Sequence, residues 1–219
     1  MQPAADMTLD ELRVALAPLL AGEAAFDGWS DAGLAAAARS LGIPPSRALL
    51  AFPEGAVEMI DAWFASIDKA MEQALPAETL ATMRIRERIT TLVAKRLELV
   101  APYREAMRRA LAILAMPHHL TTGAQLGWRA ADAMWRLAGD DATGFAHYSK
   151  RATLAAVYGA TLLTLLDDTS EGHADTLAFL DRRIDEVMGF EKFKARLKPN
   201  PDHHFNFGRF LGRLRYPTH

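Results

Sequence analysis

Apolar residues recur along this chain at the three- and four-residue spacing of a helix, and alanine and leucine are frequent among them. No run of residues alternates apolar and polar side chains in the manner of a half-buried strand. Half of the 219 residues are hydrophobic, which is the balance of a folded globular protein with a sizeable core. We therefore expect an all-α fold.

Composition excludes several classes of functional site. The sequence contains no cysteine, so it has no disulfide, thiolate zinc site, iron–sulfur cluster or cysteine nucleophile. His118 and His119 are adjacent and should point in different directions. His203 and His204 lie among helix breakers, so neither pair has the i, i+4 spacing of a helical metal site. Since no glycine-rich phosphate loop or serine–histidine pair can be defended either, we expect no metal, no cofactor and no catalysis by this chain.

Capping and breaker residues place the ends of the expected helices. Thr8 and Glu11 have the spacing of a capping box, and Pro18 is expected to trim the end of that first helix. The acidic junction at residues 167–173 should supply caps and solvated charge, and the cations of residues 84–96 should form a solvated stripe. The expected helices cover residues 8–21, 30–42, 44–52, 55–75, 76–100, 102–115, 121–139, 144–166 and 171–188.

Residues 26–64 have the layout of a helix-turn-helix: a short helix, a glycine turn, a second short helix and a longer helix. This frame resembles the N-terminal domain of TetR-family regulators. Its small core is expected to contain Trp29, Leu34, Ala37, Ala38, Leu41, Ile43, Leu49 and Leu50.

The segment in the place of the recognition helix, PPSRALLAF, is poorly suited to reading DNA. Only Ser46 and Arg47 offer polar contacts, and the few nearby cations are offset by Asp31 and Glu54. The net charge of −2 adds no long-range attraction. We expect no specific binding of nucleic acid, and a TetR-type transcriptional regulator that responds to a hydrophobic ligand is the alternative function.

A second segment, residues 84–188, has a distinctive amino-acid sequence. It contains RIRERITTLVAKRLELVAPYREAMRRALAILAMPHHL, DAMWRLAGDDATGFAHYSKRATLAAVYGATLLTLLDDTS and DTLAFLDRRIDEVM. These stretches resemble the lipid-binding accessory proteins of coenzyme Q (ubiquinone) biosynthesis, which have a TetR-like fold. The resemblance implies a non-catalytic protein that binds an isoprenoid quinone or precursor lipid and presents it to the demethoxyubiquinone hydroxylase. Consistent with this, the chain lacks the Glu-x-x-His pairs that a di-iron bundle needs.

The resemblance also implies two sites. The partner-binding surface would comprise Trp135, Leu137, Asp140, Phe145, His147, Tyr148 and Arg151. Packing of an interhelical corner by the aromatic residues is the alternative to partner binding. The lipid cavity would lie between the middle helices and be lined by Leu92, Val93, Leu97, Leu111, Leu114, Met116, Leu126, Met134 and Tyr158. These positions fit a filled core equally well.

The final residues have the pattern of a basic amphipathic helix. Apolar residues fall at i, i+3, i+4 and i+7, with arginines on the remaining faces. We expect this tail to bind an anionic membrane surface through Phe207, Arg209, Phe210, Leu211, Arg213 and Leu214. Folding of the tail onto the protein's own body is the alternative.

The expected domain organisation has four parts. They are a degenerate helix-turn-helix domain over residues 1–54, a helical lipid-binding and dimerisation domain over 55–190, a linker over 191–203 and the membrane-binding tail over 204–219. The segment ATLAAVYGATLLTLL is too short and too interrupted to span a bilayer. The visible start has no signal or transit peptide. We expect a protein that is cytoplasmic in a bacterium and peripheral on the inner face of the cell membrane, or on the matrix side of the inner mitochondrial membrane after processing.

A homodimer is also expected, because TetR-like folds dimerise through their last two long helices. Here these helices are residues 144–166 and 171–188. Their apolar faces carry Leu154, Val157, Leu162, Leu165, Leu177, Leu180 and Ile184.

Overall fold

The computed structural model describes residues 6–197, and their side chains as far as residue 188. Every regular element in these residues is a helix, which confirms the all-α prediction. The α-helices are α1 (Leu9–Asp27), α2 (Asp31–Ser40), α3 (Pro45–Ala51), α4 (Ala56–Ala74), α5 (Ala77–Ala81), α6 (Ile85–Val100), α7 (Arg104–Leu114), α8 (Leu120–Leu137), α9 (Gly144–Asp167) and α10 (Ala174–Leu197). Short 3-10 turns precede α7, α8 and α10: η2 (Ala101–Tyr103), η3 (Pro117–His119) and η4 (Glu171–His173).

The first helix begins where the sequence predicts and ends later. The Thr8 backbone N–H donates to Glu11 Oε2 at 2.7 Å, and the Glu11 N–H donates to Thr8 Oγ1 at 3.2 Å, so the capping box is confirmed. The expected end at residue 21 is wrong, because α1 continues through Pro18 to Asp27. Proline costs a helix interior about 3 kcal/mol. Burial of apolar residues on both sides of it offsets that cost: Leu12, Leu16, Ala17, Leu20, Ala21 and Ala24.

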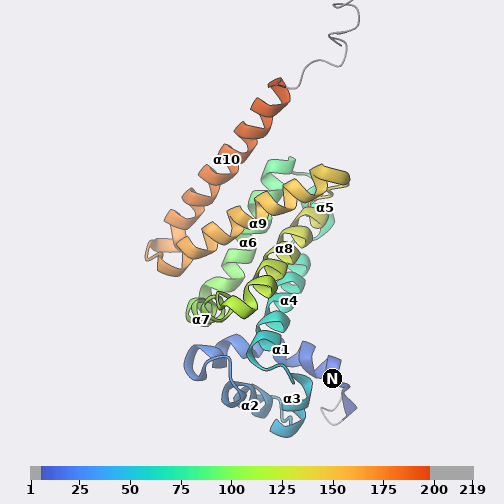
Figure 1. Ribbon diagram of the computed structural model, residues 1–219, viewed down its shortest axis with the longest axis vertical. Helices are drawn as coiled ribbons and strands as arrows, with labels where there is room; N and C mark the ends of the chain where they lie inside the picture. Colours follow the sequence, from blue (N-terminus) through green and yellow to red (C-terminus); the bar gives the residue numbers. More distant parts are fainter. Residues whose placement is uncertain (1–5, 198–219) are drawn as a thin grey trace, which may run out of the picture. The chain divides into compact units, whose positions relative to one another are not determined.

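The helix-turn-helix layout of residues 26–64 is confirmed by α2, α3 and the longer α4, and α1 packs against all three (Figure 1). Ser30 caps α2 by accepting the Gly33 N–H at 3.3 Å, and Gly42 ends it with φ +67°. The expected core is correct for Trp29, Leu34, Ala37, Ala38 and Ile43, which are all buried.

The expected core is wrong at Leu49 and Leu50, which are 40% and 64% exposed. The short α3 turns Ala48 and Ala51 inward instead, so the two leucines lie on its outer face. Leu41 is half-buried.

The single helix expected over residues 76–100 is two helices, α5 and α6. The break is stabilised locally. The Thr82 hydroxyl donates to the Thr79 carbonyl at 2.9 Å, and the Arg84 N–H donates to Glu87 Oε2 at 2.9 Å, so Glu87 caps a new helix. Arg88 donates to the Met83 carbonyl at 2.9 Å and thus satisfies a backbone group that the break leaves open.

Two further boundaries differ from the sequence prediction. Neither Thr121 nor Thr122 caps α8, because that helix begins at Leu120 directly after η3. The last helix was expected to end at Met188 and instead continues to Leu197, through the first residues of the predicted linker. The rest of the linker and the predicted membrane-binding tail, with Phe207, Arg209, Phe210, Leu211, Arg213 and Leu214, lie outside the described residues.

The chain divides into two compact units, residues 1–184 and 185–219. The first contains α1 to α9 and the start of α10, and the described part of the second is the helical end of α10. Within residues 6–197, no helix combines the length and the apolar character needed to cross a membrane.

Candidate functional site

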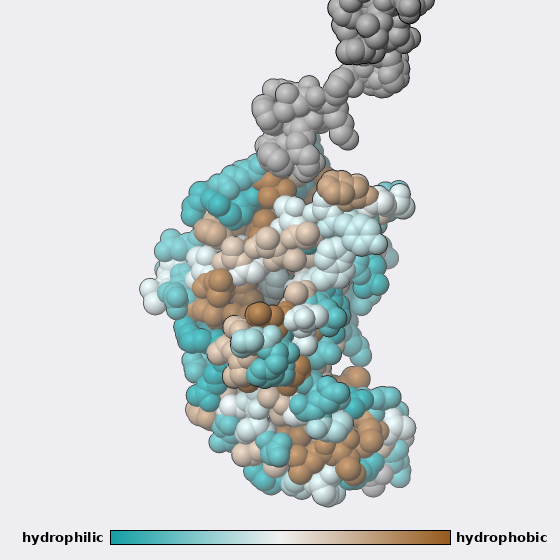
Figure 2. All heavy atoms as spheres, viewed as in Figure 1, coloured by the Kyte–Doolittle hydropathy of each residue, from teal (hydrophilic) through white to brown (hydrophobic). Residues whose placement is uncertain are grey.

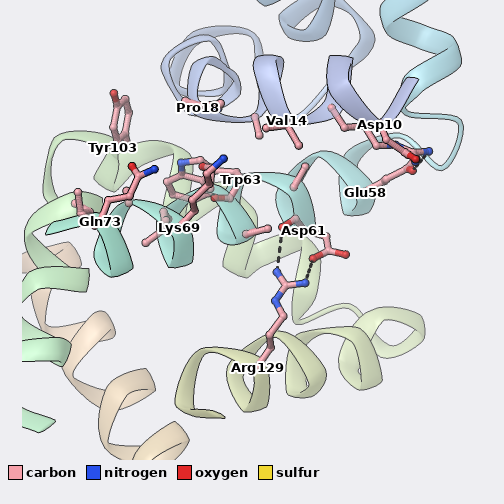
Figure 3. A pocket seen from close by; sticks show the side chains of 18 residues that line it. Asp10, Val14, Pro18, Glu58, Asp61, Trp63, Lys69, Gln73, Tyr103 and Arg129 are labelled. Atoms are coloured by element: carbon pink, nitrogen blue, oxygen red, sulfur yellow. Dashed lines mark hydrogen bonds and ion pairs between the residues drawn. The ribbon is translucent and has the colours of Figure 1, made fainter. Parts of the chain in front are cut away.

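An open groove of about 850 Å³ runs between α1 and α4 (Figure 3). Tyr103 of η2 and Arg129 of α8 also border it. Its walls are mostly apolar and many of its side chains are small. The apolar lining consists of Val14, Ala17, Pro18, Ala62, Trp63, Ala65, Ile67, Ala70 and Leu99. Sequence analysis missed this groove, because the crossing of α1 and α4 cannot be read from either helix alone.

The charged groups at one end and in the middle of the groove are paired with one another. Arg13 contacts Asp10 at 2.9 Å and Glu58 at 2.7 Å. Arg129 donates to the Asp61 carbonyl at 3.1 Å and also contacts the Asp61 carboxylate, as the dashed lines in Figure 3 show. The other end of the groove holds Lys69, Gln73 and Tyr103.

A series of charged side chains connects the groove with the core. Arg129 Nε lies 3.6 Å from Asp68 Oδ2, and Asp68 also pairs with Arg96 of α6. The Arg96 guanidinium lies 5.2 Å from the centroid of the Tyr158 ring. Burial disfavours the charge of Arg96, but Tyr158 and Asp68 outweigh this effect and raise its pKa. The expectation that Arg96 belongs to a solvated stripe is therefore wrong, because its side chain is 1% exposed.

The residues predicted to line a lipid cavity lie in α6 to α9 and the turn after α7. Most of them are buried in the core: Leu92, Val93, Leu97, Leu114, Leu126, Met134 and Tyr158. Leu111 is half-buried and Met116 is 43% exposed. None of the nine lines the groove between α1 and α4. Their role in lipid binding stays a prediction.

The residues predicted to bind a partner are brought together where α8 ends and α9 begins. Arg151 Nε lies 2.6 Å from Asp132, and its Nη1 lies 3.2 Å from Asp140. Lys150 Nζ contacts the other oxygen of Asp140 at 2.5 Å. Burial raises the pKa of the Asp140 carboxyl, but Lys150 and Arg151 outweigh it and hold the pKa below its ordinary value. These ion pairs join α8, the turn and α9.

Four aromatic residues on α8 and the start of α9 form what we call the aromatic corner: Trp128, Phe145, His147 and Tyr148. Trp128 and His147 are half-buried, whereas the other two are exposed. Phe145 is 83% exposed and Tyr148 is 63% exposed. The Tyr148 ring centroid lies 5.9 Å from that of Trp128 and 5.2 Å from that of His147. Sequence analysis missed Trp128, which lies two helical turns before Trp135 on the same face of α8.

Trp135 and Leu137 are half-buried and differ from the exposed aromatic residues. The Trp135 indole N–H donates to the Lys150 carbonyl at 3.1 Å, and Lys150 Nζ lies 5.1 Å from the centroid of the Trp135 ring. Trp135 therefore packs the interhelical corner, whereas Phe145 and Tyr148 face solvent.

The acidic junction before α10 supplies a cap, as the sequence predicts. Asp168 is buried and accepts the Ser170 N–H at 2.8 Å and the Thr176 N–H at 2.9 Å. Asp167 is 87% exposed and pairs with Arg108 at 3.1 Å. These interactions join α9, α10 and α7.

Within residues 6–188, whose side chains the structure describes, no group of three or more His, Asp or Glu side chains is arranged to hold a metal ion. His118 and His119 do not diverge as the sequence suggests, because their ring centroids are 3.9 Å apart.

The helices expected to form a homodimer bury most of their apolar faces within the chain itself. Leu154, Val157, Leu162, Leu165, Leu180 and Ile184 are buried, and Leu177 is 42% exposed. On α9, Leu163 is 59% exposed. The homodimer stays a prediction, and its contact surface would have to use the exposed leucines.

Comparisons with known proteins point to one family and one fold. A sequence model of the COQ9 family matches residues 120–191, which contain the aromatic corner. The human mitochondrial ubiquinone biosynthesis protein COQ9 is 33% identical over 178 residues, or 78% of this chain and 56% of that protein. The probable mitochondrial ubiquinone biosynthesis protein coq9 of Dictyostelium discoideum is 25% identical over 173 residues, or 76% of this chain and 56% of that protein. The chain thus spans about half the length of these curated relatives.

The crystal structure of a TetR transcriptional regulator from Nitrosomonas europaea superposes on this chain with a TM-score of 0.64. The two sequences are 24% identical, and the match covers 80% of this chain and 97% of the regulator. The predicted TetR-like fold is therefore confirmed.

Proposed function

Since the chain belongs to the COQ9 family, we propose that it takes part in ubiquinone biosynthesis as a non-catalytic lipid-binding protein. It binds an isoprenoid quinone or a precursor lipid and presents it to the demethoxyubiquinone hydroxylase at a membrane surface. The observation that carries this proposal is the aromatic corner, which lies within the residues that the family model matches.

The aromatic corner has the properties of a protein-binding surface. Full burial of a side chain such as Phe145 stabilises a complex by roughly 1.5–3 kcal/mol. Aromatic residues are also enriched among those that carry most of the binding energy at interfaces. The ion pairs of Arg151 and Asp140 fix the start of α9 before a partner arrives, which lowers the cost of ordering it on association. The hydroxylase is the partner we assign to this surface.

The lipid is assigned to the interior between α6, α8 and α9, where six of the nine predicted lining residues lie. These helices bury apolar side chains that include Leu97, Met134 and Tyr158. The unbranched side chain of Met134 adapts readily to an elongated apolar ligand. The lipid would replace side-chain contacts in this core rather than fill an open pocket.

Replacing both Phe145 and Tyr148 with Ser tests the docking proposal. Binding of the purified hydroxylase, measured by biolayer interferometry, is expected to weaken about tenfold or more. Leu50→Ser on α3 is the matched control, because Leu50 is 64% exposed and Tyr148 is 63% exposed. Undiminished binding by the double variant would show that the aromatic corner does not bind the hydroxylase. Mass spectrometry that finds no isoprenoid lipid with the purified protein would contradict the lipid-binding role.

Presentation at a membrane is assigned to the tail at residues 204–219, which carries the predicted amphipathic pattern. The protein would lie peripherally on the inner face of a bacterial cell membrane, or on the matrix side of the inner membrane in mitochondria. Flotation with anionic liposomes is expected for the full chain and not for a chain ending at Lys198. Equal flotation of the two would exclude the tail as the anchor.

A further inference from the structure

We propose that the groove between α1 and α4 is a binding site for a single-chain amphiphile with a carboxylate or phosphate head. This site is separate from the interior lipid site proposed above and does not depend on a role in ubiquinone biosynthesis. The apolar chain lies along the groove, and the head lies at the end formed by Lys69, Gln73 and Tyr103.

The dimensions of the groove fit an extended chain. Its lining residues on α4 run from Glu58 to Gln73, a span of roughly 22 Å at about 1.5 Å per residue. The volume of about 850 Å³ lies within the range of roughly 300–1,000 Å³ that is usual for small-molecule sites. The groove therefore has the length and the volume to hold an extended lipid chain.

The middle of the groove offers apolar contact and few free polar groups. Val14 is 61% exposed and lines the groove on the α1 side, and the small residues Ala62 and Ala65 line it on the α4 side. The Ser66 hydroxyl donates to the Trp63 carbonyl at 2.7 Å, so it does not require a partner from a ligand. Contact with an apolar chain would remove this surface from water, which favours binding by about 25 cal/mol per Å² of apolar surface buried.

The two ends of the groove differ in charge. At the end formed by Asp10, Arg13 and Glu58, the guanidinium is paired with both carboxylates. At the other end, within the described residues, the side chains of Lys69 and Gln73 have no hydrogen-bond or ion-pair partner.

The third residue at this end, Tyr103, is held by its ring and not by its hydroxyl. Its ring packs edge-on against Trp63, with centroids 6.3 Å apart, and the hydroxyl has no hydrogen-bond partner in the described residues. Figure 3 shows Lys69, Gln73 and Tyr103 at one end and Asp10 and Glu58 at the other. The Lys69 ammonium is thus available to an anionic head for a charge-assisted hydrogen bond, and Gln73 and Tyr103 supply two further donors at the same end of the groove.

The test uses the full chain and three probes that share an eighteen-carbon chain but differ in head group: oleate, oleoyl lysophosphatidate and oleyl alcohol. Lys69→Glu is expected to weaken the binding of oleate and lysophosphatidate about tenfold, as measured by calorimetry, and to leave the affinity for oleyl alcohol unchanged. Ala65→Phe, which fills the groove, is expected to weaken all three. Arg39→Glu on α2 and Ala112→Phe on α7 are the matched controls, since both positions are exposed and lie outside the groove.

A diazirine-bearing oleate then maps the site in the unaltered protein, so the result does not depend on the folding of any variant. Cross-links to α1 and to residues 58–73 of α4 are expected. Failure of all three probes to bind, equal oleate affinity in Lys69→Glu, or cross-links confined to α6, α8 and α9 would overturn the groove assignment. The last result would leave the interior lipid site standing, so the two proposals fail independently.

Discussion

Arg151 Nη1 lies 3.2 Å from Asp140 Oδ2, and both side chains are only 3% exposed. Each member of this ion pair has a further charged or polar partner. Arg151 also contacts Asp132 at 2.6 Å and donates to the His147 carbonyl at 3.3 Å, while Lys150 contacts Asp140. A single buried guanidinium therefore fixes the backbone beneath the aromatic corner.

Removing the Arg151 guanidinium should destabilise the fold. Arg151→Ala is expected to lower the free energy of unfolding by about 3 kcal/mol, because it leaves Asp140 and Asp132 partly uncompensated in a buried place. Urea denaturation followed by circular dichroism measures the loss. Arg136→Ala is the control, since Arg136 pairs with the same Asp132 at 3.1 Å but is 67% exposed, and it should cost less than about 1 kcal/mol. Equal losses in the two variants would show that burial of Arg151 is not what matters.

The Asp168 cap predicts a dependence of stability on pH. Hydrogen bonds from the Ser170 and Thr176 hydroxyls, and from their backbone N–H groups, hold the pKa of the Asp168 carboxyl well below its ordinary value, although burial opposes them. A carboxylate with a lowered pKa stabilises the fold above its ordinary pKa of about 3.9 and loses this contribution as the pH falls toward the folded-state value.

The unfolding free energy of the unaltered protein should therefore fall more steeply below about pH 4 than that of Asp168→Asn. Urea denaturation at a series of pH values compares the two slopes. Asp167→Asn is the control, and it should change the unfolding free energy little because Asp167 is 87% exposed. Parallel slopes for the unaltered protein and Asp168→Asn would contradict the role assigned to the cap.

Local signals in the sequence predicted the fold well because they depend on residues a few positions apart. Thr8 with Glu11, Ser30 before Gly33, and the left-handed Gly42 all act within one turn of a helix. The same kind of signal was overlooked at Arg84 and Glu87, where the Glu87 side chain accepts the Arg84 backbone N–H and caps a second helix in place of one continuous helix.

Features that depend on distant residues were not predictable in this way. Arg96 is buried because Asp68, 28 positions earlier, and Tyr158 of α9 lie beside it. The groove exists because α1 crosses small residues of α4, and periodicity within either helix does not reveal that crossing. The aromatic corner was predicted from a family resemblance, whereas its ion pairs and the contribution of Trp128 required the structure.

Self-association would have to use the leucines that remain exposed on the last long helices. Leu163→Asp combined with Leu177→Asp is expected to convert a dimer to a monomer in sedimentation at micromolar concentration, because it places charges in an apolar contact. Leu120→Asp on α8 is the control, since Leu120 is 57% exposed on another helix. A monomeric unaltered protein would show that the homodimer prediction is wrong.

The helix in the place of a recognition helix presents hydrophobic side chains to solvent. Figure 2 shows hydrophobic residues gathered over the end of the molecule where α3 lies, and Leu49 and Leu50 are 40% and 64% exposed there. Arg47, the cation of α3, donates to the Met7 carbonyl at 2.6 Å, which engages its guanidinium within the protein.

Sequence-specific binding needs side chains that hydrogen-bond to base edges and cations that neutralise phosphates, and α3 supplies neither in a usable position. Binding of duplex DNA is therefore expected to be weak and independent of sequence. An unbiased selection from random duplexes at about 0.15 M salt, followed by fluorescence anisotropy on the enriched sequences, measures this directly. Specific regulators bind their sites roughly 10³-fold or more tighter than random duplex. Enrichment of one site with such a preference would revive the transcriptional regulator as the function of this chain, whereas equal, salt-sensitive binding to all duplexes is the result expected from an apolar α3.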